Sequence, residues 1–253
     1  MNTDLAPWEE RWVWLGGSVL LACLVAWTGW AVRQMGGAPQ RWYQAWRRWH
    51  GRPWIEQTAR FLYTIGVPAA ALLWRGVLKE SALGLQPFPW QSDAPLTAAL
   101  PGGWDNWLRD LLWALALGAG MAVLVAATVR TLKRAGAYRL TLRHDGAVAL
   151  REAAFHETHW AFYREPFILL WGMEIGAWAG AFLALLEAAV NPACWARLRD
   201  PAAGRDLVLR LALGIASALL FLLTQNFWLT VLLDTGLGWG WGIAHPRPAS
   251  PDA

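Results

Sequence analysis

The chain of 253 residues is 56% apolar and 16% charged, whereas an average soluble domain is roughly 45–50% apolar and about 25% charged. This composition argues against a soluble globule, and an aromatic content of 13% excludes a disordered chain. A net charge of +4 is compatible with nucleic acid binding, but the arginines lie beside apolar segments, so we expect the lipid bilayer as partner and no nucleic acid.

Tryptophan is unusually frequent, with 21 residues, and its ring suits the boundary between a bilayer and water. Six segments approach the roughly 20 predominantly apolar residues that cross a hydrocarbon core. We therefore expect one integral membrane domain over residues 1–253, folded as an all-α polytopic helical membrane bundle with five or six transmembrane helices. The expected spans are 12–32, 61–78, 111–129, 167–190, 207–223 and 227–241, with one long tilted helix over 207–241 as the alternative to the last two.

Arginine is concentrated in two of the expected connections, 33–60 and 130–151. Basic residues favour the cytoplasmic side of a membrane, so the pattern predicts that both connections are cytoplasmic and that the N-terminus and the connection 79–106 lie outside. The connection 191–206 conflicts with this orientation, because its arginines would then lie outside. We expect a multi-pass protein of a plasma membrane, of the bacterial inner-membrane type.

The first basic connection contains a short amphipathic pattern over about 40–50. Three tryptophans recur at positions i, i+4 and i+7, and three arginines lie off this stripe. The spacing predicts a helix in the membrane interface, which either recognises an acidic lipid or a partner helix or simply anchors the neighbouring spans. The tryptophans are Trp42, Trp46 and Trp49, and the arginines are Arg41, Arg47 and Arg48.

The densest polar cluster precedes the fourth expected span. Glu152, His156, His159 and Tyr163 are spaced i, i+4, i+7 and i+11, so a helix places them on one face. The two histidines are three residues apart, whereas zinc proteases of the His-Glu-x-x-His type need four. Three interpretations of this cluster remain open. The charges simply neutralise one another, the residues carry out acid–base chemistry without a metal, or another helix completes a metal site. We expect no resident metal and no cofactor.

Among the ionisable residues within expected spans, we single out Arg75, Glu174, Glu187 and Asp234. A charged group inside a bilayer costs several kcal/mol and normally faces the protein interior, so each is a candidate functional residue. Glu187 and Arg75 lie near span ends, where water is within reach. Glu174 and Asp234 lie deeper and need partners or a proton.

Two segments carry a resemblance to a known family. The segment 151–156 reads Arg-Glu-Ala-Ala-Phe-His, and the segment 224–228, Thr-Gln-Asn-Phe-Trp, precedes Leu-Asp-Thr-Gly-Leu-Gly at 233–238. Over about 140–241 the chain resembles the CAAX-protease and bacteriocin-processing family of intramembrane proteases. The family's first motif has a second glutamate and an arginine where this chain has Arg151 and His156. Its middle motif is missing, because no histidine occurs between His159 and His245.

The resemblance implies a function and a set of site residues. It implies Glu152 as the general base, His156 or His159 as oxyanion donor, and Asp234 in the position of the late histidine. We assign substrate binding to Arg164, to Glu174 and to Asn226 of the late motif. Because these motifs are depleted, we expect weak or absent cleavage of membrane-anchored peptides, with a peptide or a helical membrane protein as the partner. The alternative is a non-enzymatic membrane subunit or a small carrier that uses buried carboxylates.

Overall fold

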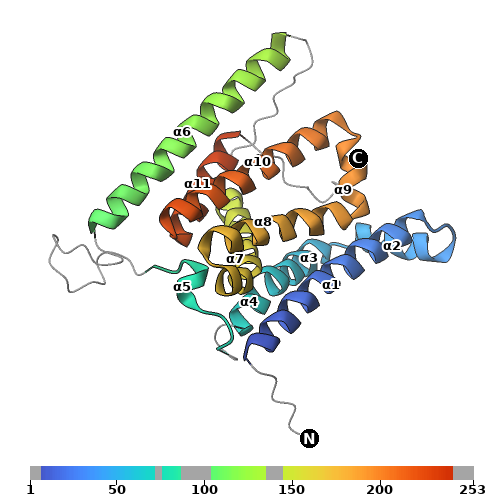
Figure 1. Cartoon of the computed structure of the whole chain (residues 1–253). Coiled ribbons are helices and arrows are strands. Elements are labelled where there is room, and N and C mark those ends of the chain that lie inside the picture. Colours follow the sequence, from blue (N-terminus) through green and yellow to red (C-terminus); the bar gives the residue numbers. More distant parts are fainter. Residues whose placement is uncertain (1–6, 72–75, 87–103, 135–144, 242–253) are drawn as a thin grey trace, which may run out of the picture.

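The computed structural model of the protein describes residues 7–71, 76–86, 104–134 and 145–241. In these ranges the regular elements are helices and no strand is present, which confirms the all-helical prediction (Figure 1). The helices are α1 Pro7–Gln34, α2 Ala38–Arg48, α3 Arg52–Phe61, the π-helix η1 Leu62–Gly66, α4 Val67–Ala69, α5 Glu80–Leu83, α6 Trp104–Arg134, α7 Gly146–Trp171, α8 Met173–Val190, α9 Pro192–Leu198, α10 Pro201–Thr224 and α11 Phe227–Trp241.

Four helices are long and apolar enough to cross a membrane, judged by length and composition. Their large apolar side chains are mostly exposed, and Leu112, Val123 and Phe182 each keep about two thirds of their surface uncovered, at 67%, 68% and 66%. A soluble monomer rarely exposes apolar surface on this scale, so the finding is consistent with a membrane protein. The four segments are Glu9–Gln34, Trp104–Ala127, Met173–Val190 and Leu207–Thr224.

The second expected span, 61–78, is not one regular α-helix. α3 continues through the π-turn η1 into α4, while Val77 and Leu78 lie beyond the helical segment. Pro68 follows the π-turn, and because proline has no N–H it cannot complete the regular hydrogen-bond ladder. Arg75 and residues 87–103 of the expected connection 79–106 lie outside the described residues.

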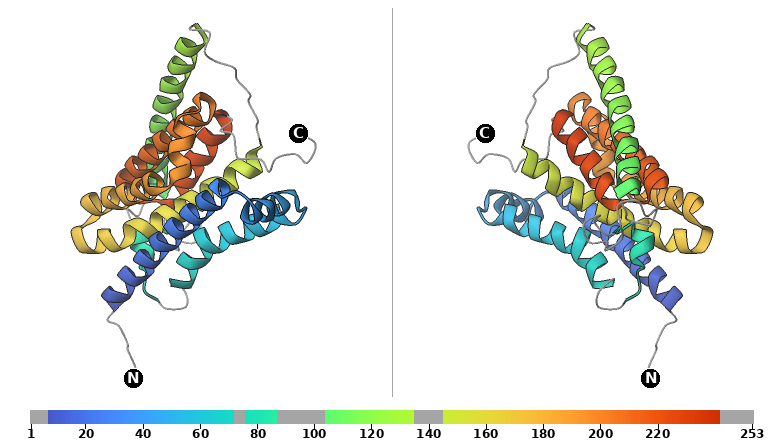
Figure 2. Two further views of the ribbon diagram at one scale, coloured as in Figure 1. Left: turned by 90° about the vertical axis from the view of Figure 1, so that its right-hand side faces the viewer. Right: turned by 90° about the vertical axis from the view of Figure 1, so that its left-hand side faces the viewer.

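The fourth expected span, 167–190, is divided between two helices. Gly172, with φ 81° and ψ 175°, separates α7 from α8, so Glu174 lies in the first turn of α8 instead of deep inside a helix. The two helices pack closely and antiparallel, because a Cβ atom built on Gly176 would lie 2.3 Å from the Cα of Ile168, and one on Gly180 would lie 2.4 Å from the Cα of Arg164. The start of α7 and the end of α8 therefore lie at the same end of the pair (Figure 2).

The segment 207–241 forms two helices, as expected, and the single long helix is wrong. α10 ends at Thr224, and Asn226 caps α11 by accepting hydrogen bonds from the backbone N–H groups of Trp228 at 3.1 Å and Leu229 at 3.4 Å. The connection is covered by the chain after α5, whose Gly84 carbonyl accepts from the N–H of Phe227 at 2.8 Å. The polar residues that divide the segment thus form a tight turn.

α7 is the central helix of the bundle. It contacts α8 and α11 most extensively and also packs against α1 and η1 (Figure 1). α6 packs against α10 and α11, with Leu233 beside Gly118. α7 buries both apolar rings such as Phe162 and charged groups such as Glu157 and Glu165, so its buried surface is partly polar.

Candidate functional site

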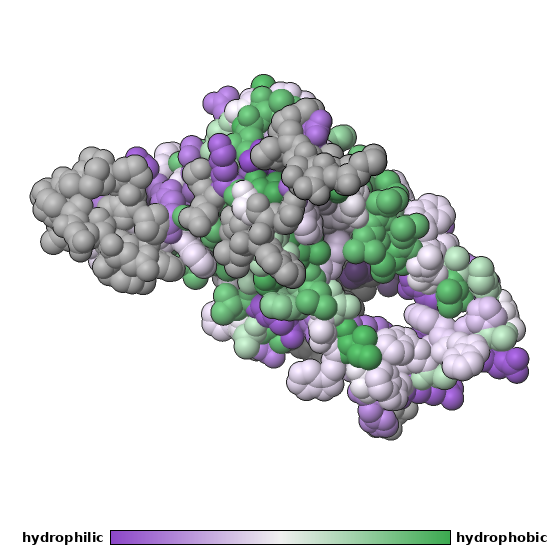
Figure 3. All heavy atoms as spheres, turned by 90° about the horizontal axis from the view of Figure 1, so that it is seen from below, coloured by the Kyte–Doolittle hydropathy of each residue, from purple (hydrophilic) through white to green (hydrophobic). Residues whose placement is uncertain are grey.

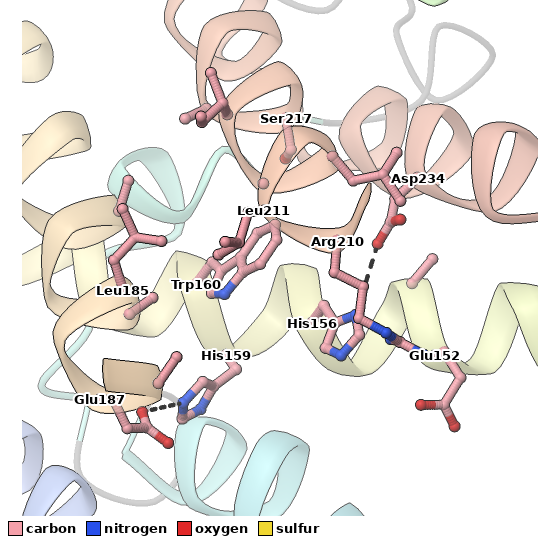
Figure 4. Close-up of a pocket in the computed structure, with 18 of the residues that line it drawn as sticks. Glu152, His156, His159, Trp160, Leu185, Glu187, Arg210, Leu211, Ser217 and Asp234 are labelled. Atoms are coloured by element: carbon pink, nitrogen blue, oxygen red, sulfur yellow. Dashed lines mark hydrogen bonds and ion pairs between the residues drawn. The ribbon is translucent and has the colours of Figure 1, made fainter. Parts of the chain in front are cut away.

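A cavity of about 350 Å³ lies among α7, α8, α10 and α11 (Figure 4). Glu152, His156 and His159 line it from α7, and Asp234 lines it from α11. The helical spacing predicted the three α7 residues on one face, and the late motif supplied Asp234. The structure therefore brings together the four residues to which the sequence assigned a catalytic role.

Glu152 is held by two arginines. The Arg60 guanidinium donates to both carboxylate oxygens, at 3.0 and 2.7 Å, and Arg151 donates to one of them at 3.1 Å. The Glu152 side chain is almost fully buried, whereas both arginine side chains are partly exposed. Charge-assisted hydrogen bonds of this kind are strong, and they occupy lone pairs on both carboxylate oxygens.

His156 and Asp234 face each other across the cavity. The His156 Nδ1 atom lies 3.9 Å from the Asp234 Oδ2 atom, which is an ion pair when the imidazole is protonated and is too long for a direct hydrogen bond (Figure 4). The His156 ring stacks on Trp160, with ring centroids 5.9 Å apart. This ring contact fixes the imidazole beside the carboxylate without occupying either ring nitrogen.

His159 belongs to a separate hydrogen-bonded chain. Its Nε2 atom lies 3.2 Å from Oε2 of Glu187 on α8, and the hydroxyl of Tyr163 donates to the same oxygen at 2.6 Å. The Tyr163 oxygen lies 3.2 Å from that of Tyr63, which also contacts Ser18 on α1. The chain links α1, η1, α7 and α8, so it ties the cavity wall to the rest of the bundle.

Several polar atoms on the cavity wall lack hydrogen-bond partners in the part of the chain that the structure describes. They are Nδ1 of His159, Nε of Arg164 and Oδ2 of Asp234, all buried. Buried polar groups in proteins are nearly always satisfied by protein, water or a ligand. The cavity therefore has both donors and acceptors for a polar guest.

The opposite wall of the cavity is apolar. α8 contributes small side chains one helical turn apart, and α10 contributes larger aliphatic ones. A guest with one polar edge and one apolar face fits this combination. The residues of this wall are Ala177, Ala181, Ala184, Leu185 and Ala188 on α8 and Leu207, Leu211, Leu213 and Ile215 on α10.

The three residues assigned to substrate binding have different positions. Arg164 lines the cavity, with its guanidinium carbon 3.3 Å from the ring centroid of Phe221. Asn226 is fully buried and caps α11 at the turn after α10. Glu174 is exposed in the first turn of α8 and does not line the cavity. Only Arg164 of the three is placed to touch a guest.

Glu157 is a buried residue to which the sequence assigned no role. Its side chain is completely buried, and its polar and charged neighbours include Ser217, Thr230, Asp234 and Arg164. Little in the sequence indicates that Glu157 is buried, because its neighbours in the chain include two histidines and several charged residues. Trp160 and Arg210 also line the cavity, and no motif marked them.

No group of three histidine, cysteine or acidic side chains lies close enough to hold a metal ion within the described ranges. Comparisons with protein-family models, with curated proteins and with solved structures found no match to this chain. The fold and the site therefore define a class only: an all-helical protein with four helices long and apolar enough to span a membrane and with a cavity that is polar on one side.

Proposed function

We propose that this protein is an intramembrane-protease-like membrane protein that binds a membrane-anchored peptide in the cavity among α7, α8, α10 and α11 and cleaves it weakly or not at all. The observation that supports this proposal best is the state of Glu152. Both oxygens of this carboxylate already accept hydrogen bonds from Arg60 or Arg151, so they are not free to accept a proton from a bound water. It is therefore a poor general base for activating water.

His156 and Asp234 are the remaining pair suited to acid–base work. The carboxylate faces the imidazole at 3.9 Å, and both groups line the cavity. An orienting carboxylate beside a histidine is the usual support for proton transfer. Stabilisation of an oxyanion needs aimed donors, and Arg164 and Ser217 are donors among the residues that line the cavity. These groups are suited to binding a peptide carbonyl, but they do not take the place of the histidine of the missing middle motif.

The arrangement of α7 and α8 supports a revised orientation in the membrane. If α8 crosses the bilayer, its antiparallel partner α7 crosses too, and residues 191–206 then lie on the same side as 135–145. Arg197, Arg199 and Arg205 thus join the other arginine-rich connections on the cytoplasmic side of a bacterial inner membrane. With α11 and the expected second span, 61–78, included, we propose seven membrane segments in place of five or six.

A small carrier is the second candidate function. Asp234 faces the cavity and Glu157 is buried near it, so two carboxylates lie close together in the bundle interior. Carboxylates inside membrane bundles commonly mark ion or proton pathways. A non-enzymatic packing subunit is less well supported, because it does not require polar residues of different helices to converge.

The proposal is tested by cross-linking and cleavage on one preparation. A photo-reactive residue at Ala181, on the cavity wall, is compared with one at Phe182, which is exposed on the outside of the same helix. We expect a membrane-anchored peptide library to cross-link at 181 and not at 182, with little cleavage. Absence of cross-linking at 181 contradicts peptide binding. Robust cleavage that Glu152→Gln abolishes contradicts the inactive state, whereas cleavage that persists in this variant removes Glu152 from the mechanism.

A further inference from the structure

The α2–α3 hairpin presents a surface that no other described segment covers. Neither helix has a buried residue, and Trp42 and Trp54 are 78% and 80% exposed. The hairpin lies beside α1 at the edge of the bundle (Figures 1 and 2). From below, hydrophilic side chains lie next to weakly polar ones at the end of the molecule where the hairpin is found (Figure 3). Large exposed aromatic side chains gathered on short helices mark an interaction surface.

The positive charge of this surface is not fully neutralised by acidic side chains of the described residues. Arg52 pairs with Glu56 at 2.6 Å, and Arg60 pairs with Glu152. The remaining arginines of the hairpin are exposed and form no ion pair with any residue that the structure describes, and α2 itself contains no acidic residue. They are Arg41, Arg47 and Arg48, which leave three positive charges beside the tryptophans.

The position of α2 along the chain places it at a membrane boundary. The candidate span of α1 ends at Gln34, and α2 begins at Ala38 after a turn at Gly37 with φ 74°. Three residues, 35–37, separate the two helices, so α2 begins at headgroup level where α1 leaves the hydrocarbon core. At that depth tryptophan rings enter the acyl boundary, while arginine side chains extend toward phosphate groups.

We propose that the α2–α3 hairpin is a binding surface for anionic phospholipid headgroups. Its occupant is the anionic leaflet surface itself, held by the exposed tryptophans and by Arg41, Arg47 and Arg48. A zwitterionic headgroup offers the same apolar boundary but carries no net negative charge. The arginines therefore select anionic over zwitterionic lipids, and the tryptophans set how deeply the hairpin lies in the bilayer. The proposal is independent of peptide binding, because none of these residues lines the cavity.

The test uses the full chain in neutral detergent micelles. Phosphatidylglycerol and phosphatidylcholine are titrated separately, and bound lipids are counted by native mass spectrometry. Three proteins are compared: wild type, R41Q/R47Q/R48Q, and the control R134Q/R197Q/R199Q, which removes three exposed arginines from other parts of the chain. A basic residue near an anionic surface strengthens attraction about fivefold, so we expect the triple hairpin variant to lose preference for phosphatidylglycerol on the order of a hundredfold.

The control variant is expected to keep most of that preference, and Trp42→Ala with Trp54→Ala is expected to weaken retention of both lipids. The proposal is overturned if wild type binds the two lipids equally, or if the control loses as much as the hairpin variant. It is also overturned if a polyglutamate peptide displaces phosphatidylglycerol at lower concentration than the lipid itself binds, because the surface then serves an acidic protein. Circular dichroism of each variant establishes that the helices are intact.

Discussion

Arg60 and Glu152 lie 92 residues apart in the sequence and form a two-hydrogen-bond pair, at 3.0 and 2.7 Å, that joins α3 to α7. The planar guanidinium matches the carboxylate, a geometry that lysine cannot reproduce. Glu152 lines the cavity, so the same pair neutralises the carboxylate expected to act as a base there. Its structural role and its effect on catalysis can be separated by mutation.

We expect Arg60→Gln to lower the free energy of unfolding by about 1–2 kcal/mol, the lower part of the range for hydrogen bonds to charged groups, because the Arg60 side chain is partly exposed. Thermal unfolding in detergent measures the loss. The exchanged variant R60E/E152R should recover part of it, since the pair is rebuilt with opposite polarity. An Arg60→Gln protein as stable as wild type shows that Arg151 alone satisfies Glu152.

The close contact between α7 and α8 gives a second prediction. Gly180→Ala places a methyl group about where the α7 backbone lies, since a Cβ there would be 2.4 Å from the Cα of Arg164. The two helices must separate, and we expect a loss of roughly 2–4 kcal/mol, typical of severe overpacking. Gly120→Ala in α6 is the matched control, because nothing lies within 4 Å of its added Cβ. Equal unfolding temperatures for the two variants are incompatible with the tight α7–α8 contact.

Gly84 gives a third prediction at the turn that covers the α10–α11 connection. Its φ of 77° is unfavourable for residues with a side chain, and an added Cβ would lie 2.5 Å from Cε2 of Phe221. We expect Gly84→Ala to cost about 1–3 kcal/mol and to loosen this connection. Hydrogen exchange of the Phe227 amide, which donates to the Gly84 carbonyl, should accelerate. Gly236→Ala, which has open space around its added Cβ, should leave that exchange unchanged.

The sequence predicted the features that depend on local pattern. α1 and α6 follow from long apolar segments, and the face shared by Glu152, His156 and His159 follows from helical spacing. The break at Gly172 was missed, because a glycine inside an apolar run is compatible with a continuous helix until its positive φ is known. That break makes α7 the central helix and moves Glu174 to an exposed turn.

The partners of the charged residues could not be predicted. Glu157, Arg164 and Glu165 lower the hydropathy of α7, so the sequence presents a polar segment where the structure has a buried helix. Nothing in the residue types indicates that Arg60 binds Glu152 while Asp234 faces His156. Such pairs are set by helix packing over long sequence distances, which a single sequence does not encode in any local pattern.

The last prediction concerns orientation, and it follows from the antiparallel pairing of α7 and α8. In a background without Cys23 and Cys194, single cysteines are placed at Gln44, Asp145 and Arg199, with Asp4→Cys as the outside reference. We expect a membrane-impermeant maleimide to label position 4 on intact cells and to reach the other three only after permeabilisation, because arginine-rich connections favour the cytoplasm. Labelling of Arg199→Cys from outside, with Asp145→Cys protected, means that α7 does not cross alongside α8. Labelling of both from outside, with position 4 protected, reverses the whole orientation.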